Sequence, residues 1–203
     1  NVNDGKEVWK QSYPCKGGDY PGPRSTPAVD GSVIYTISTD GDVLCMDAAK
    51  GTVKWKKNVL NELGVTRPKW GFAGSPCIEG DKLLINAGKT GVALDKKTGK
   101  ELWRSADVGG YSTPVAYKAG GKDSIALFSQ KGAYGVDLNT GKELWFFGWE
   151  TAYDVNAADP IISGARVFIS SGYDHGCALL DISGPQAKEV WQSKVLRSHF
   201  SCC

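Results

Sequence analysis

Few residues of this chain could take part in chemistry, and their spacing fits none of the common catalytic patterns. His175 and His199 are the only histidines, and no serine or cysteine is placed as a nucleophile beside a base. The stretch AGKTG at 87–91 has the look of a phosphate loop, but Leu83 stands where that loop needs glycine. The stretch DGD at 40–42 would open a calcium loop, but Gly51 stands where its glutamate is needed. We therefore predict no catalytic residue and no metal ligand.

Cysteines form a second group of reactive residues, and there are six of them: Cys15, Cys45, Cys77, Cys177, Cys202 and Cys203. None belongs to a CxxC pair, which argues against a zinc site. Cys45 and Cys77 lie in strand-like runs, so we expect buried, inert thiols there. Cys202 and Cys203 are adjacent, and neighbouring side chains in a strand face opposite ways. This cysteine usage does not fix the redox compartment.

The composition describes a turn-rich β protein that can bury a substantial core. The chain has 203 residues, 41% of them hydrophobic, with 26 glycines, 9 prolines and 7 tryptophans. Its net charge of +2 is too small to indicate a nucleic-acid partner. No apolar run approaches the roughly 20 residues of a membrane helix, so we expect no membrane span. Only the short stretch 58–65 reads as a helix.

A repeat organises the chain. Trp9, Trp55, Trp103, Trp145 and Trp191 follow one another at intervals of 46, 48, 42 and 46 residues. An aspartate precedes the tryptophan by eight residues in three repeats and by ten in the last, and these aspartates are Asp47, Asp95, Asp137 and Asp181. We expect each aspartate to accept backbone N–H groups of the turn that follows it. The aspartates and tryptophans are therefore assigned a structural role.

A second mark lies upstream in each repeat. A small or polar residue followed by proline occurs at 26–27, 75–76, 113–114 and 159–160, and an apolar β-type run follows each one. Each repeat thus predicts four strands: one after the proline, one at the apolar run, one ending at the aspartate and one holding the tryptophan. Four-stranded units with a period of 40–50 residues indicate an all-β β-propeller.

The repeat boundaries divide the chain into blades. We expect residues 1–10 to be the last strand of a preceding blade and 197–203 to start a following one. Four blades are expected at 22–58, 71–106, 109–148 and 155–194. Since an open array exposes apolar faces, we expect either further blades beyond this sequence or a second copy of the chain to cover them.

The phrase Asp-x-x-Thr-Gly-Lys-x-x-Trp, at 95–103 and 137–145, resembles the tryptophan-docking motif of the PQQ-type (quinoprotein-like) repeat family. The phrases GPRSTPAVDG, WGFAGSP and YDVNAADPIISG are similar to bacterial PQQ-binding-like propellers. The resemblance implies a ring of seven or eight blades and an exported, periplasmic protein. The resemblance also implies an alternative function, that of a PQQ- and calcium-dependent dehydrogenase of alcohols or sugars. In such an enzyme Cys202 and Cys203 would form a vicinal disulfide over the quinone. The calcium-and-quinone segment Gly-Ala-Glu is absent from this sequence, so no cofactor is expected.

The segments that precede each first strand are the better candidates for function, because such loops crowd the channel mouth of a propeller. They carry the candidate ligand-binding residues Arg24, Trp70, Tyr111, Asp154, Asn156 and His199. Trp70 and Tyr111 could equally plug the channel as core. We expect a non-catalytic binding or scaffold protein that takes a protein, peptide or small ligand at these loops. The dehydrogenase is the alternative.

Overall fold

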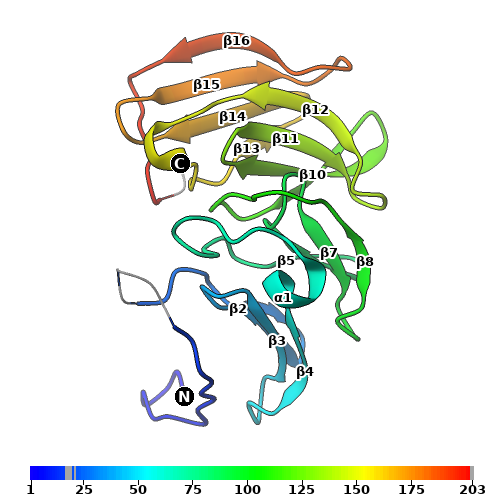
Figure 1. The fold of residues 1–203 in the computed structure, drawn as a ribbon, viewed down its shortest axis with the longest axis vertical. Helices are drawn as coiled ribbons and strands as arrows, with labels where there is room; N and C mark the ends of the chain where they lie inside the picture. Colours follow the sequence, from blue (N-terminus) through cyan, green and yellow to red (C-terminus); the bar gives the residue numbers. More distant parts are fainter. Residues whose placement is uncertain (17–19, 21, 202–203) are drawn as a thin grey trace.

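The computed structural model describes residues 1–16, 20 and 22–201, and its sheets follow the chain in order (Figure 1). The described residues form four antiparallel sheets of four strands each, which follow one another in Figure 1 from the first sheet at the bottom to the last at the top. Within each sheet the strands pair in sequence order, and we call the sheets blades 1 to 4. The first strands lie innermost, since β1 contacts β5 and β5 contacts β9 across blade boundaries. The predicted propeller architecture is confirmed.

The strands of blades 1 and 2 are β1 (Ala28–Asp30), β2 (Val33–Ile37), β3 (Asp42–Asp47), β4 (Val53–Asn58), β5 (Cys77–Glu79), β6 (Lys82–Ile85), β7 (Val92–Asp95) and β8 (Glu101–Arg104). Those of blades 3 and 4 are β9 (Val115–Ala119), β10 (Lys122–Ser129), β11 (Gly132–Asp137), β12 (Glu143–Gly148), β13 (Ile161–Ser163), β14 (Arg166–Ser171), β15 (Gly176–Asp181) and β16 (Lys188–Ser193). Every first strand begins one residue after the repeated proline. Every third strand ends at the repeated aspartate, as the sequence predicts.

Two short helical segments interrupt this pattern. The helix α1 (Val59–Leu63) follows β4, where the sequence predicts one. Its N-cap Asn58 accepts a hydrogen bond from the Asn61 amide at 2.8 Å, and Gly64 ends it with a φ of 64°. The 3₁₀ turn η1 (Ala152–Asp154) lies between blades 3 and 4. Within the described residues, no helix has the length and apolar character needed to cross a membrane.

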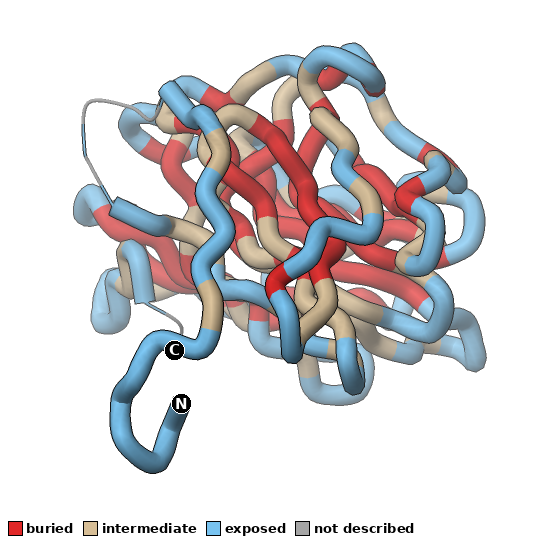
Figure 2. The backbone as a smooth tube through the Cα atoms, turned by 90° about the horizontal axis from the view of Figure 1, so that it is seen from below, coloured by how far each residue is buried: buried red, intermediate tan, exposed pale blue. Residues whose placement is uncertain are grey.

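The hydrophobic core lies between the blades, so each sheet buries a face against every sheet beside it, and Figure 2 shows the buried residues in the interior of the molecule. One cluster joins blades 1 and 2 through side chains such as Tyr35 and Leu83. A second joins blades 2 and 3 around Leu84 and Leu127, and a third joins blades 3 and 4. A single blade would expose both of its apolar faces to water, so its stability depends on packing against neighbouring sheets.

The repeated aspartates organise the turns between third and fourth strands. Asp137 accepts hydrogen bonds from the amides of Asn139 and Thr140 at 3.0 and 2.9 Å, and from the Thr140 hydroxyl at 2.9 Å. Asp47 and Asp95 accept the equivalent amides of their own turns. At Asp181 the donors are the amide and hydroxyl of Ser183. These bonds are the ones predicted for the aspartates.

The repeated tryptophans reach from one repeat into the next. The indole N–H of Trp55 donates to the Lys96 carbonyl at 3.1 Å, and that of Trp103 donates to the Leu138 carbonyl at 2.9 Å. Trp9 donates in the same way to the Ala48 carbonyl. Each indole covers a turn glycine of the following blade, and those glycines are Gly51, Gly99 and Gly141. The positive φ of these glycines and the closeness of the ring both disfavour a β-carbon.

Trp145 and Trp191 depart from this arrangement. The turn of blade 4 carries Ala187 four residues before its tryptophan, where the other blades carry glycine. The indole N–H of Trp145 donates instead to the Tyr117 hydroxyl of its own blade at 2.8 Å, although the ring remains buried between blades 3 and 4. Trp191 lies on β16 and is 42% exposed. A methyl group on the turn of blade 4 thus coincides with the loss of the Trp145 hydrogen bond to that turn.

A β-bulge recurs beside every one of the four blade tryptophans. The register between third and fourth strands shifts directly after the residue that pairs with the tryptophan, for example after Gly135, which pairs with Trp145. Such a bulge adds twist and redirects the side chains that follow it. Nothing in the strand patterns of the sequence indicated these bulges.

Candidate functional site

The residues that precede the repeated prolines form a ladder across the four blades. The Thr26 amide donates to the Ser75 hydroxyl at 2.9 Å, and the Ser75 amide donates to the Thr113 hydroxyl at 3.4 Å. The Thr113 amide donates in turn to a carboxylate oxygen of Asp159 at 2.6 Å. Each residue therefore gives its amide to the side chain of the same position one blade further on. The ladder fixes the spacing of the innermost strands.

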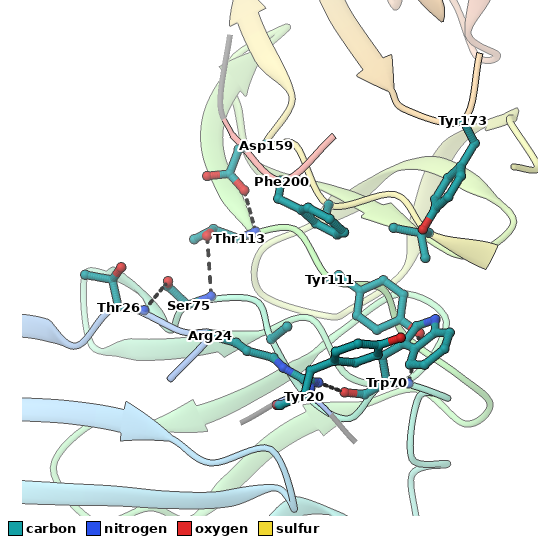
Figure 3. Close-up of a pocket in the computed structure, with 13 residues that line it drawn as sticks. Tyr20, Arg24, Thr26, Trp70, Ser75, Tyr111, Thr113, Asp159, Tyr173 and Phe200 are labelled. Carbon is teal, nitrogen blue, oxygen red and sulfur yellow. Dashed lines mark hydrogen bonds between the residues drawn. The ribbon is translucent and has the colours of Figure 1, made fainter. Parts of the chain in front are cut away.

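A pocket of about 680 Å³ lies along this ladder (Figure 3). Segments of all four blades line it, and the lining residues are Tyr20, Arg24, Thr26, Trp70, Ala73, Ser75, Tyr111, Thr113, Val155, Ala157, Asp159, Tyr173 and Phe200. Five of the thirteen are aromatic, and only two carry a formal charge. The volume and the mixture of apolar walls with a few polar groups are typical of a ligand pocket.

Three of the predicted binding residues meet in one wall of this pocket. The Arg24 guanidinium donates to the Trp70 carbonyl through one nitrogen and to the Tyr20 carbonyl at 3.1 Å through another. The Trp70 amide donates to the Tyr111 hydroxyl at 3.4 Å. The Tyr20 and Trp70 rings lie 6.0 Å apart between centroids. Arg24, Trp70 and Tyr111 thus come together from three different loops, as Figure 3 shows.

Burial defines the chemistry of that wall. Tyr111 is 6% exposed, and its burial raises the pKa of the phenol above its usual value. The phenol therefore stays protonated at neutral pH and serves as a hydrogen-bonding group rather than as a base. Trp70 is half-buried and lines the pocket beside the Tyr20 ring. The wall can stack against a ligand and hydrogen-bond to it.

Asn156, also predicted to bind a ligand, lies inside the protein instead. It is 0% exposed, and its amide nitrogen donates to the carbonyls of Ser129 and Trp149, both at 2.9 Å. Its carbonyl oxygen accepts the Ser171 hydroxyl at 2.7 Å. These bonds tie the segment before β13 to blades 3 and 4. Asn156 therefore shapes the floor of the site without lining it.

Asp154 and His199 lie beside the pocket and do not line it. Asp154 ends the turn η1 with a φ of 57°. The His199 ring stacks on Phe200 at 3.6 Å between centroids and meets Tyr173 edge-on at 4.4 Å. Burial lowers the pKa of His199, so the imidazole is neutral at neutral pH. It supports two lining aromatic residues.

Sequence reasoning missed the lining residues Tyr20, Asp159, Tyr173 and Phe200. Asp159 could have been found, because it occupies the repeated position before proline where the other blades carry serine or threonine. Tyr173 could not, since it lies in the hairpin between β14 and β15 and no repeat rule marks it.

The thiols and carboxylates show no metal centre in the part of the chain that the structure describes. No group of three or more histidine, cysteine, aspartate or glutamate side chains converges among those residues. Both thiols were predicted to be buried; Cys45 is buried and Cys77 is half-buried, and burial raises the pKa of each. Cys202 and Cys203, the predicted vicinal disulfide, lie outside the described residues.

Comparison with known proteins gives the site its context. The model of the family described as outer membrane protein assembly factor BamB matches residues 1–200. No relative among the curated proteins matches the chain. The crystal structure of BamB from Moraxella catarrhalis has a TM-score of 0.73 at 16% identity and is matched over 100% of this chain.

The quinohemoprotein alcohol dehydrogenase from Comamonas testosteroni has a TM-score of 0.62, also at 16% identity, and is matched over 84% of this chain. The computationally designed Ika8 protein has a TM-score of 0.58 at 12% identity over 87% of this chain. The chain spans 59% of the length of the BamB chain, 35% of the dehydrogenase and 50% of Ika8. At these identities the similarity shows a shared propeller fold.

Proposed function

The chain belongs to the PQQ-type propeller family described as outer membrane protein assembly factor BamB, and from that membership we propose that it is a non-catalytic scaffold that binds a protein or peptide partner in its pocket. The family description names an assembly factor, whose work is done by contacts with other proteins. It also names the outer membrane, which supports export to the periplasm as part of the proposal.

The observation that carries the proposal is the wall formed by Arg24, Trp70 and Tyr111. Arginine, tryptophan and tyrosine are the residue types that dominate binding energy at protein interfaces. The Arg24 and Tyr111 side chains are already held by hydrogen bonds to the Trp70 backbone, so these two lose little side-chain freedom when a partner binds. A preformed aromatic wall beside an arginine suits the side chains and backbone of a peptide.

The donor set of the pocket does not fit the alternative, a quinone held by calcium. Calcium takes six to eight oxygen ligands, most of them carboxylates or carbonyls. The pocket offers one carboxylate, Asp159, and one of its oxygens already accepts the Thr113 amide. The Comamonas testosteroni dehydrogenase shares the fold, and at 16% identity it supports nothing beyond the fold.

A peptide-display selection tests the proposed function. A random peptide library is selected against the immobilised chain, and the recovered peptides are titrated against the wild type, Trp70→Ala and Trp191→Ala. Trp191 is a matched control because it is a partly exposed tryptophan on the outer strand of blade 4 and does not line the pocket. We expect Trp70→Ala to weaken binding at least about tenfold and Trp191→Ala to leave it unchanged.

Two outcomes would overturn the proposal. One is recovery of no peptide that binds the wild type more tightly than about 1 mM. The other is equal binding of the recovered peptides to the wild type and to Trp70→Ala, because the pocket would then not be their site. Dye reduction from an alcohol after addition of PQQ and calcium would show the dehydrogenase instead.

A further inference from the structure

Two tyrosines beside the pocket have backbone conformations that tyrosine rarely adopts. Tyr153 has a φ of 64° in η1, and Tyr173 has a φ of 53° in the hairpin between β14 and β15. The aspartate that follows each one also has a positive φ, and these are Asp154 and Asp174. In the hairpin, the His175 amide donates to the Gly172 carbonyl at 3.1 Å, which closes a tight turn whose two central positions favour glycine or asparagine.

Neither tyrosine side chain is buried in the core, so core packing does not offset the cost of this backbone conformation. Tyr153 is 58% exposed and Tyr173 is 43% exposed. The two rings meet each other at 5.1 Å between centroids, with an angle of 59° between their planes. Left-handed residues other than glycine persist where the surrounding structure holds them, and they cluster at functional sites. The pair therefore forms an exposed aromatic shelf, which we call the tyrosine shelf.

The tyrosine shelf is continuous with the pocket. Tyr173 lines the pocket itself, and Figure 3 shows its side chain on the side opposite the Arg24 wall. The Lys69 ammonium bridges the shelf and that wall, at 5.8 Å from the Tyr153 ring centroid and 5.2 Å from the Trp70 ring centroid. A partner that enters the pocket would therefore also meet Lys69 and the two tyrosines.

The positive charges along this surface lack anionic partners. Among the residues that the structure describes, neither Lys69 nor Arg24 forms an ion pair, and Arg24 donates only to carbonyl groups. Two of the nearby anions are already engaged: Asp159 accepts the Thr113 amide, and Asp174 pairs with Lys194 and Arg197. Asp154 is the remaining acidic residue of the shelf segment and does not line the pocket.

Resting on the proposed function, we propose that the partner segment is an extended acidic–aromatic peptide. The aromatic side chain of the peptide stacks between the Arg24 wall, at Trp70, and the tyrosine shelf. The neighbouring carboxylate of the peptide pairs with Lys69. An aromatic ring suits the spacing of two aromatic surfaces that face a common pocket. A carboxylate supplies the negatively charged partner that Lys69 lacks, at a site where the Lys69 ammonium already lies near two aromatic rings.

The first test compares carboxylate with amide in the peptide. Peptides recovered by display are expected to be enriched in aspartate or glutamate within two positions of an aromatic residue. Replacing that carboxylate by its amide should weaken binding to the wild type about tenfold and leave binding to Lys69→Gln unchanged. Absence of the enrichment, or equal weakening in wild type and Lys69→Gln, overturns the acidic preference. Peptide binding at Trp70 would then survive, so the proposed function and this inference fail separately.

The second test separates binding from stability at the shelf. Tyr173→Gly gives the turn a residue that favours its conformation and removes the ring. We expect the midpoint of urea unfolding to stay the same or rise, while peptide affinity falls at least fivefold. Tyr173→Phe keeps the ring and should retain the affinity, and Tyr153→Gly provides an independent second site. A lower urea midpoint with unchanged affinity in both glycine variants would identify the tyrosines as structural and overturn the proposal.

Discussion

The contact between an indole and a turn glycine allows a controlled test of what holds two blades together. Gly141 has a φ of 71°, and a β-carbon added there would lie 2.6 Å from an atom of the Trp103 ring. Gly80 has a φ of 57°, and a β-carbon added there would meet nothing within 4 Å. Both positions therefore penalise alanine for its backbone, but only Gly141 penalises it for the neighbouring blade.

The magnitudes follow from these two contributions. A left-handed conformation costs a residue other than glycine about 1–2 kcal/mol, which applies at both positions. Forcing a methyl group into a well-packed contact costs about 1–3 kcal/mol more, which applies at Gly141 alone. We expect Gly80→Ala to lower the free energy of unfolding by about 1–2 kcal/mol and Gly141→Ala by about 2–5 kcal/mol.

The assay is urea unfolding followed by far-ultraviolet circular dichroism, with the midpoint and the slope recorded for each variant. Gly141→Ala is also made together with Trp103→Leu, which removes the ring. In that background the excess penalty of Gly141→Ala over Gly80→Ala should disappear. Equal losses for the two alanine variants in the wild-type background would refute the reasoning, because the indole would then exert no constraint on its glycine.

Three further predictions concern a carboxyl group, a buried amide and the thiols. The Ser183 hydroxyl and amide hold the pKa of Asp181 at about 2, so its contribution to stability is present above pH ~4 and is lost as the pH falls towards 2; the difference in urea midpoint between wild type and Asp181→Asn should shrink over that range. Asn156→Ala leaves buried carbonyls without their donor and should lower the free energy of unfolding by at least about 2 kcal/mol, as measured by urea titration; a change under about 0.5 kcal/mol would contradict this. Of the four described cysteines, exposed Cys15 should react with N-ethylmaleimide first in mass spectrometry, with Cys45 and Cys177 unlabelled until the protein is denatured.

Most of the fold could be predicted because each blade repeats the same local chemistry. Proline has no backbone N–H to donate within a sheet, so the first strand begins after it. The turn aspartate marks the end of the third strand. These constraints act within a few residues of the chain and are legible in any one repeat. The departures of Trp145 and Trp191 depend on the next blade, and only Ala187 hinted at one of them.

The candidate site was predictable in part, because its position follows from topology and its composition does not. The loops before the first strands must meet at the centre, so Arg24, Trp70 and Tyr111 could be gathered from the sequence. Whether a given side chain faces the pocket depends on packing. Packing places the Asn156 side chain in the interior, and it places Tyr173, from a hairpin, in the pocket lining. Backbone conformation, which marks the tyrosine shelf, leaves no signal in residue type.

The amide-to-side-chain ladder along the innermost strands has a consequence for how such a chain can grow. All three junctions use the same position, and serine, threonine and aspartate each accept the preceding amide there. A blade copied in tandem by gene duplication would therefore find a usable acceptor on one side and offer one on the other. Blade number can then change by recombination without a new interface having to arise, while the pocket residues outside the ladder, such as Trp70 and Tyr111, diverge independently.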